Sequence, residues 1–317
     1  MLDPRDLYEL HDQTSSLTSA GPADGTASAG PVLLHVLTGF IDAGQAGALA
    51  RDHLLATLDH RPVATFDVDQ LLDYRSRRPV MVFVEDHWES YDEPSLALHV
   101  VQDDAGTPFL LLEGAEPDVQ WERFLKAVLH LVERLDVRLT IGVHGIPMAL
   151  PHTRPTGLTA HATRLELIAG HPPWIGTVQV PGSVGNLLEY RLGQAGRDAM
   201  GFAVHVPHYL AQAEYPDAAK VLLEAVATAA RLSLPAPQLQ AAAERTRAEI
   251  DEQVSASPEV VAVVQALEQQ YDAYVDARGR GNPLTGHDGS VPTGDELGAE
   301  LERFLAERTR RGDPPDG

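Results

Sequence analysis

The amino-acid sequence predicts an α/β protein with a mixed sheet and a helical C-terminal extension. The apolar pattern of residues 32–67 predicts a strand, a loop, a helix and a second strand. This order is typical of a βαβ unit with a parallel sheet. Residues 80–113 contain three strand-like runs without a helix between them, and this predicts at least partly antiparallel pairing. Beyond Ser233 only helix-like periodicity remains. Together these observations define the fold class.

The predicted elements follow from apolar spacing. Residues 32–37 are a continuous apolar run, which is typical of a strand buried on both faces. The other expected strands are 63–67, 80–84, 96–102, 109–113, 138–143, 174–180 and 201–206. The expected helices are 46–58, 119–135, 184–195, 217–232, 239–254, 259–277 and 295–311.

Changes in composition divide the chain into three regions. Residues 1–31 are a short segment followed by a flexible linker that is rich in Ser, Thr, Ala and Gly. Residues 32–235 form the α/β domain, and residues 236–317 form the helical region. We expect the C-terminal helices to lie on the α/β domain or on a neighbouring subunit.

The composition excludes several classes of function. The chain has 24 Lys and Arg against 46 Asp and Glu, with a net charge of −22, which argues against nucleic-acid and anionic-membrane partners. The absence of cysteine excludes disulfides, thiolate metal sites and cysteine nucleophiles. The N-terminus does not resemble a signal peptide, and no apolar run is long enough to span a membrane. A cytoplasmic protein is therefore expected.

Polar residues follow several predicted strands, where α/β proteins commonly bind ligands. The most prominent segment is the end of the strand at 138–143 and the rigid, proline-rich loop after it. These positions predict a crevice at the carboxyl ends of the strands. The candidate ligand-binding residues are Gly39, Asp42, Gly44, Asp67, Glu113, His144, His152, Thr153 and Arg154.

Each candidate also has a structural interpretation. The loop Gly39-Phe-Ile-Asp-Ala-Gly44 could bind an anion at a helix start. However, Asp42 can cap that helix itself, and the dinucleotide-binding and Walker spacings are absent. Arginines 75, 77 and 78 could clamp a carboxylate or phosphate, but ion pairing within the chain or with a neighbouring subunit is the favoured interpretation.

The histidines do not form a recognised catalytic or metal motif. His144, His152, His205 and His208 could join a carboxylate in a metal site or in an acid–base pair. With 14 histidines in the chain, chance clustering of hydrogen-bonded side chains is the simpler interpretation. No G-x-S-x-G elbow is present, and Ser183 is better explained as a helix cap. We therefore assign no catalytic residue, metal or cofactor.

Several blocks, in this order, resemble the proteasome assembly chaperone two family in its bacterial two-domain form. The blocks are Gly39-Phe-Ile-Asp-Ala-Gly44, Phe66-Asp-Val-Asp69, Asp73-Tyr-Arg-Ser-Arg-Arg-Pro79, Leu112-Glu-Gly-Ala-Glu-Pro117 with Trp121, Gly145-Ile-Pro147, Pro151-His-Thr-Arg-Pro155 and Val206-Pro-His-Tyr209. The resemblance covers about residues 1–235. It implies a three-layer α/β/α sandwich like that of nucleoside phosphorylases, and a homo-oligomer, for which we expect a trimer.

The resemblance favours a protein-binding function over catalysis. Relatives in archaea and eukaryotes are ATP-independent assembly factors for proteasome subunits, so the first hypothesis is a non-catalytic, assembly-chaperone-like protein that binds itself and another protein complex. The alternative is a binding protein or enzyme for a small nucleoside- or anion-type molecule, which would use the crevice. The phosphorylase-like fold is not itself evidence of phosphorolysis.

Overall fold

A computed structural model describes residues 2–11, 30–172 and 176–279. The chain forms two compact units, of which the larger comprises residues 1–173 and 181–269 and the smaller residues 174–180 and 270–317. All the strands found among the described residues lie in the larger unit. The helix expected at 295–311 lies outside the described residues.

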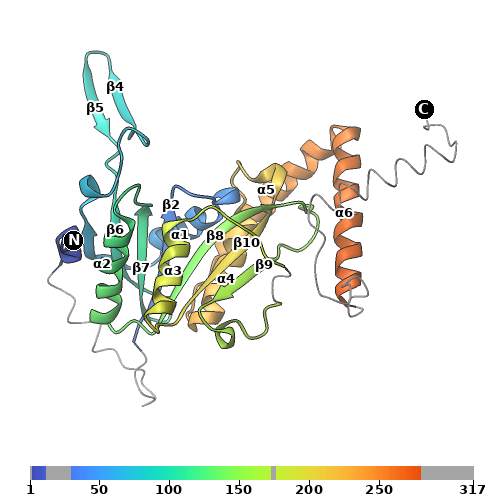
Figure 1. Cartoon of the computed structure of the whole chain (residues 1–317). Coiled ribbons are helices and arrows are strands. Elements are labelled where there is room, and N and C mark those ends of the chain that lie inside the picture. The colour runs from blue at the N-terminus through green and yellow to red at the C-terminus, as the bar shows by residue number, and fades with distance from the viewer. Residues whose placement is uncertain (1, 12–29, 173–175, 280–317) are drawn as a thin grey trace, which may run out of the picture. The chain divides into compact units, whose positions relative to one another are not determined.

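An eight-stranded mixed sheet forms the centre of the larger unit, in the order β1-β3-β6-β7-β2-β8-β10-β9 (Figure 1). β7, β2, β8 and β10 are mutually parallel neighbours, whereas β1, β3, β6 and β9 join by antiparallel pairing. The strands are β1 Tyr8–Leu10, β2 Val32–Thr38, β3 His60–Phe66, β6 Leu96–Gln102, β7 Pro108–Ala115, β8 Leu139–Met148, β9 Leu158–Ala162 and β10 Ala199–Pro207.

Helices cover both faces of the sheet, which confirms the three-layer α/β/α fold. Alternate residues of the central strands point to opposite faces. Leu34 and Ile141 belong to the core that also contains residues of α1 and α4, and Leu33 and Leu110 to the core that contains residues of α2 and α3. The covering helices are α1 Ala46–Thr57, α2 Trp121–Arg134, α3 Val184–Gln194 and α4 Pro216–Ala230.

The expected helical C-terminal region is present within the described residues. It consists of α5 (Pro237–Ser255) and α6 (Pro258–Gly279). Leu239 and Ile250 of α5 belong to the core on the α1 and α4 side of the sheet. Apolar burial therefore attaches α5 to the α/β body. Among the described residues, no helix is both long enough and apolar enough to cross a membrane.

Three expectations about the strands were wrong in detail. β3 is not a neighbour of β2, although two successive antiparallel pairings through β6 and β7 give it the same direction. The strand expected at 80–84 does not join the central sheet, because it pairs with an unpredicted strand in a separate hairpin. Residues 176–180 are not a strand, whereas the edge strand β9 was not expected.

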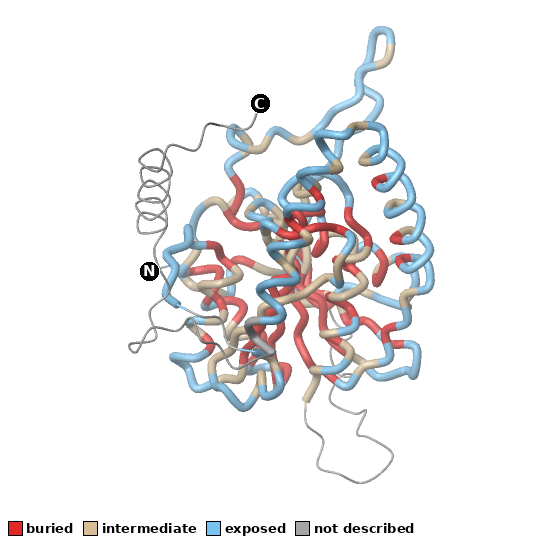
Figure 2. Tube along the Cα trace, turned by 90° about the vertical axis from the view of Figure 1, so that its right-hand side faces the viewer, coloured by how far each residue is buried: buried red, intermediate tan, exposed pale blue. Residues whose placement is uncertain are grey.

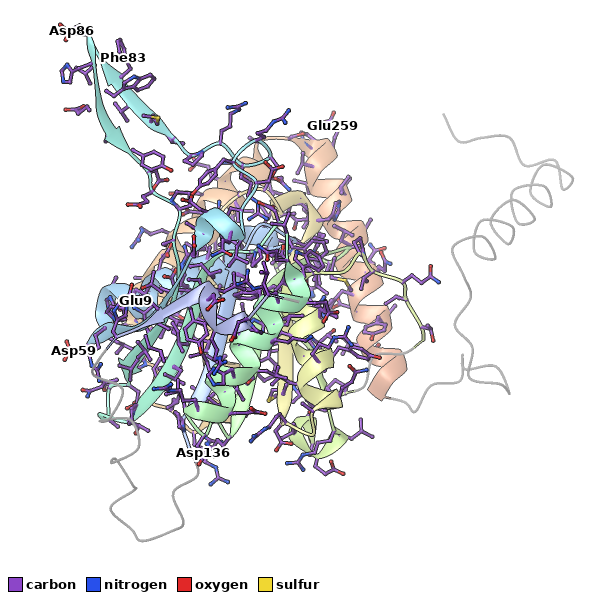
Figure 3. All side chains as sticks on the ribbon, turned by 60° about the vertical axis from the view of Figure 1, so that its left-hand side comes forward. Glu9, Asp59, Phe83, Asp86, Asp136 and Glu259 are labelled. Carbon is purple, nitrogen blue, oxygen red and sulfur yellow. The ribbon has the colours of Figure 1, made fainter. Side chains whose placement is uncertain are left out.

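The separate hairpin consists of β4 (Met81–Val84) and β5 (His87–Tyr91). It projects from the body of the larger unit and is exposed along its length (Figures 1 and 2). Figure 3 shows Phe83 on one strand and Asp86 at the tip. We refer to residues 80–91 as the projecting hairpin.

Candidate functional site

A small cavity of about 40 Å³ lies between the central strands and the first half of α3. β2 supplies His35, β8 supplies Gly142 and His144, and β9 supplies His161. We call this space the histidine cavity. Its remaining polar lining residues are Glu116, Ser183, Asn186 and Glu189, and its apolar lining residues include Phe40 and Ile41.

Strand register builds the floor of the histidine cavity. His35 on β2 lies opposite Gly142 on β8, Gly142 lies opposite Gly201 on β10, and Gly201 lies opposite His161 on β9. Four strands therefore place a histidine, two glycines and a second histidine in one row across the sheet. Side chains at opposed positions point to the same face, and on that face the two glycines leave space.

The imidazole rings occupy the space that the glycines leave. A Cβ atom added at Gly142 would lie 2.6 Å from Cε1 of His35, and one added at Gly201 would overlap the ring of His161. Gly185 on α3 packs against the same His35 ring. A Cβ atom added at Gly185 would lie 3.2 Å from Cε1 of His35. Glycine is thus required at Gly142 and Gly201 for packing, because any side chain would displace a histidine.

Burial favours the neutral form of two of the cavity histidines, His35 and His144. Desolvation lowers the pKa of His35 to about 4, with smaller contributions from the neighbouring His144 and His161. Burial also lowers the pKa of His144, although Asp42 and Glu189 oppose this shift. Near pH 7 each neutral ring offers one nitrogen as an acceptor and one N–H as a donor.

Two carboxylates face the histidine cavity. Glu116 follows β7, is buried, and accepts a hydrogen bond from the backbone N–H of Val184 at 2.5 Å. Burial raises the pKa of Glu116, while the Val184 bond acts in the opposite direction. On α3, Glu189 contacts Nδ1 of His161 through Oε2 at 2.8 Å. This His–carboxylate contact fixes the orientation of the His161 ring.

The beginning of α3 is capped as expected. Oγ of Ser183 accepts a hydrogen bond from the backbone N–H of Asn186 at 3.1 Å, which confirms Ser183 as the helix cap. The backbone N–H of Val184 donates to the Glu116 carboxylate, so Glu116 and Ser183 together accept from two of the free N–H groups at the start of α3. This arrangement disfavours anion binding at the start of α3.

Among the sequence candidates, only His144 lines the histidine cavity. Asp42 has a different environment. Its carboxylate accepts hydrogen bonds from the backbone N–H groups of Gly47 at 2.9 Å, Ala48 at 3.0 Å and Gly145 at 2.8 Å. It therefore links the first turn of α1 to β8. The predicted ligand-binding role of Asp42 stays a prediction beside this structural one.

The glycines beside Asp42 support tight backbone packing. Gly39 has a φ of +135°, and a side chain there would overlap the guanidinium of Arg77. Gly44 has a φ of +67°, donates to the carbonyl of Ala211 at 2.9 Å and accepts from the N–H of Tyr215 at 2.8 Å. Positive φ explains glycine at both positions without a ligand.

Asp67 and Glu113 lie apart from the histidine cavity. The Asp67 side chain accepts from the N–H of Asp69 at 3.1 Å and caps a 3-10 turn, η4 (Val68–Gln70). Glu113 on β7 contacts Nε2 of His99 on β6 through Oε1 at 3.2 Å. Neither side chain is among the residues that line the cavity.

The proline-rich loop 149–157 contacts the helical region. The buried His152 ring contacts the Tyr209 hydroxyl at 2.7 Å and Oδ1 of Asp251 on α5 at 3.1 Å. Thr153 donates to Glu268 on α6 at 2.5 Å, and Arg154 contacts the same carboxylate at 3.2 Å. The polar side chains that suggested a binding loop thus hold α5 and the first half of α6.

Sequence reasoning missed most of the histidine cavity, namely His35, Glu116, His161, Asn186 and Glu189. One signal was available: His35 is a titratable residue within an otherwise apolar run. A titratable side chain in a buried strand is a candidate functional group, because burial without a charged partner makes its ionisation unfavourable. Among the described residues, no group of three or more His, Asp or Glu side chains is arranged to hold a metal ion.

The projecting hairpin is a second, apolar candidate site. Its register pairs Met81 with Tyr91 and, after a bulge, Phe83 with Trp88. These four side chains therefore share one face, and the Phe83 and Trp88 rings lie 5.1 Å apart. They are exposed by 47%, 47%, 54% and 62%, respectively. A face of this kind on a protruding element is typical of a protein-contact surface.

Comparison with known proteins identifies relatives of the chain. The model of the PAC2 family matches residues 36–254. A Mycobacterium tuberculosis protein described as of unknown function is 54% identical, with 86% of this chain and 91% of that chain covered and a TM-score of 0.82. A Corynebacterium glutamicum protein of unknown function is 41% identical, with 85% and 98% covered and a TM-score of 0.79.

A more distant relative carries a functional description. A Mycobacterium tuberculosis proteasome-assembly chaperone homologue is 25% identical, with 74% of this chain and 99% of that chain covered and a TM-score of 0.68. No curated protein matches the chain. The family match extends over more than half of the chain and agrees with the resemblance of the sequence blocks. The chain therefore belongs to the PAC2 family.

Proposed function

We propose that this protein is a non-catalytic, assembly-chaperone-like protein that self-associates through the projecting hairpin. The observation that carries the proposal is the exposed face of Met81, Phe83, Trp88 and Tyr91. An isolated two-stranded hairpin is only marginally stable in water. Covering its aromatic face would stabilise it and remove apolar surface from water.

The charges at the root of the hairpin favour a second copy of this chain as the partner. Arg75 and Arg78 are exposed, and they form no ion pair with any other described residue. They belong to a chain with a net charge of −22, so another copy offers an acidic surface. A contact between the hairpin of one copy and the body of the next would be heterologous, and a rotation of about 120° between copies would close it into the trimer that we propose.

Support for the assembly role comes from the relatives. The 25% identical structure is described as a proteasome-assembly chaperone homologue, and family membership agrees with such a role. We propose that the oligomer binds subunits of a larger protein complex, the proteasome of its own cell being the first candidate. The proposed binding uses exposed surface and needs no nucleotide.

Light scattering after size-exclusion chromatography tests self-association. We expect the wild-type chain to form a discrete oligomer and the double variant Phe83→Ser/Trp88→Ser to be monomeric with an unchanged circular dichroism spectrum. Leu165→Ser is the matched control, because Leu165 is 79% exposed but lies outside the hairpin. A wild-type monomer, or a double variant with the wild-type mass, contradicts the role of the hairpin.

Reconstitution tests the assembly role separately. Proteasome subunits from the same cell would be mixed with the wild-type or the double-variant chain in the absence of ATP, and assembly would be followed on native gels. We expect the wild-type chain to accelerate assembly and to co-migrate with an intermediate. Equal assembly rates with and without the wild-type chain would count against the chaperone proposal.

A further inference from the structure

We propose that the histidine cavity binds a small primary amine as its ammonium ion, in contact with the carboxylates of Glu116 and Glu189. None of the residues that line the cavity belongs to the projecting hairpin, so this site is separate from it. The proposal depends on three properties of the cavity, which are its unpartnered histidines, its charge and its size.

The first property is unused hydrogen-bonding capacity. His35 is only 7% exposed and lines the cavity, yet its ring forms no hydrogen bond or ion pair with any residue that the structure describes. The ring of His144, which also lines the cavity, has no such partner among the described residues either. His144 is only partly buried. Buried polar groups are normally hydrogen-bonded, so the unpartnered ring of His35 beside this space indicates a ligand or ordered water.

The second property is the sign of the charge. Glu116 and Glu189 line the cavity, and none of its lining residues is Lys or Arg. The nearby Arg77 is already paired with Asp118 at 2.8 Å and donates to the Thr38 carbonyl at 3.1 Å. A phosphate or carboxylate would face two acidic side chains, whereas an ammonium ion would be attracted by both. This disfavours the anion that the sequence suggested.

The chemistry of the rings agrees with an ammonium ligand. A neutral imidazole presents one acceptor nitrogen, and an ammonium group carries three donors and no acceptor. His35 and His144 can each accept one N–H, and a carboxylate oxygen can accept another. An ammonium ion would therefore satisfy the unused acceptors of the cavity.

The third property is size. One buried water needs roughly 10–15 Å³ of such space, so a cavity of about 40 Å³ holds only about three or four non-hydrogen atoms. The apolar Phe40 and Ile41 line the same cavity, and Ile41 is 43% exposed. A short alkyl chain attached to the amine would contact these side chains. The ligand class is therefore a small alkylamine or the amine end of a longer molecule.

Nuclear magnetic resonance of the imidazole C–H groups tests the proposal on the full chain. The chain would be titrated with n-propylammonium chloride, and in parallel with n-propanol and sodium acetate at matched ionic strength. We expect the amine to shift the resonances of His35, His144 and His161 saturably. The alcohol, which lacks the charge, should bind about tenfold more weakly, and the carboxylate should not bind.

Two variants locate the site. Glu189→Gln should weaken amine binding by about tenfold by removing a charge, whereas Glu249→Gln removes an exposed carboxylate from α5 and should leave binding unchanged. Gly185→Ala places a methyl group 3.2 Å from Cε1 of His35 and should abolish binding. Because alanine favours a helix over glycine, this variant should remain folded even if Glu189→Gln does not.

The same measurements can overturn the proposal. Equal shifts with the amine and the alcohol would show that charge is not recognised. Tighter binding of acetate than of propylammonium would assign the cavity to anions instead. Wild-type amine affinity in Gly185→Ala, or no saturable shift of the three rings with propylammonium, would show that the cavity does not bind amines.

Discussion

The histidine cavity and loop 149–157 both contain histidines, but they differ in how their polar atoms are satisfied. In the loop, His152, Thr153 and Arg154 contact Tyr209, Asp251 and Glu268. In the cavity, His35 and His144 have no partner among the described residues. The polar residues of loop 149–157 therefore form a structural contact with the helical region. The cavity with unused hydrogen-bonding groups lies instead beside His35, a single histidine in an apolar strand.

The largest expected effect concerns Asp42, the candidate whose hydrogen bonds connect α1 to β8. Asp42→Ala removes the acceptor of three backbone N–H groups and should lower the free energy of unfolding by about 4 kcal/mol. Urea denaturation measures this change. Asp52→Ala on the exposed side of α1 is the control and should cost less than about 0.5 kcal/mol. Equal losses in the two variants would refute the capping role of Asp42.

The next effect is a pH dependence that arises from His35. Burial lowers its folded-state pKa to about 4 from an ordinary value of 6.5. Below pH 6.5 the unfolded chain therefore binds a proton that the folded chain excludes, so stability falls as the pH decreases from 6.5 to 4. The loss should be on the order of 3 kcal/mol across that interval.

Unfolding curves at several pH values between 7.5 and 4.5 measure this effect as the difference between the wild type and His35→Gln. The variant should lose less stability on acidification, because its side chain does not titrate. His208→Gln, which replaces an exposed histidine, is the control. Parallel pH profiles of the wild type and His35→Gln would show that His35 is not a neutral buried group in the folded chain.

A smaller effect tests the paired histidine of the loop. His152→Ala removes a buried ring with contacts to Tyr209 and Asp251 and should lower the free energy of unfolding by about 2 kcal/mol. It should also increase amide hydrogen exchange in α5 more than in the central strands. Unchanged exchange in α5 would show that the loop does not hold this helix.

The smallest effect concerns the carboxylate that holds α6. Glu268→Gln keeps one acceptor for Thr153 but removes the charge opposite Arg154, and both partners of that ion pair are partly exposed. We expect a loss of roughly 0.5 kcal/mol, which should decrease further in high salt. A loss above about 2 kcal/mol in chemical denaturation would show that this ion pair is more important than its exposure suggests.

The local elements were largely predictable from the sequence. The apolar run at 32–37 became β2, and the periodic segments at 46–58 and 184–195 became α1 and α3. These patterns are local, because alternation and 3.6-residue spacing reflect which side of one element is buried. The missed hairpin strand β5 has no apolar alternation, and its residues are exposed on both faces. Its partner strand β4 was predicted, but with the wrong neighbours.

The sequence by itself determined the α/β class, the order of most elements, the acidic charge and the resemblance to the PAC2 family. Only the tertiary structure decided which strands are neighbours, because pairing depends on long-range packing that no local period encodes. The same packing decided the site: the row of His35, Gly142, Gly201 and His161 joins residues far apart in the chain. Gly142 and Gly201, which look unremarkable in the sequence, make room for the two histidine rings, and this role depends on the rings that the neighbouring strands place over them.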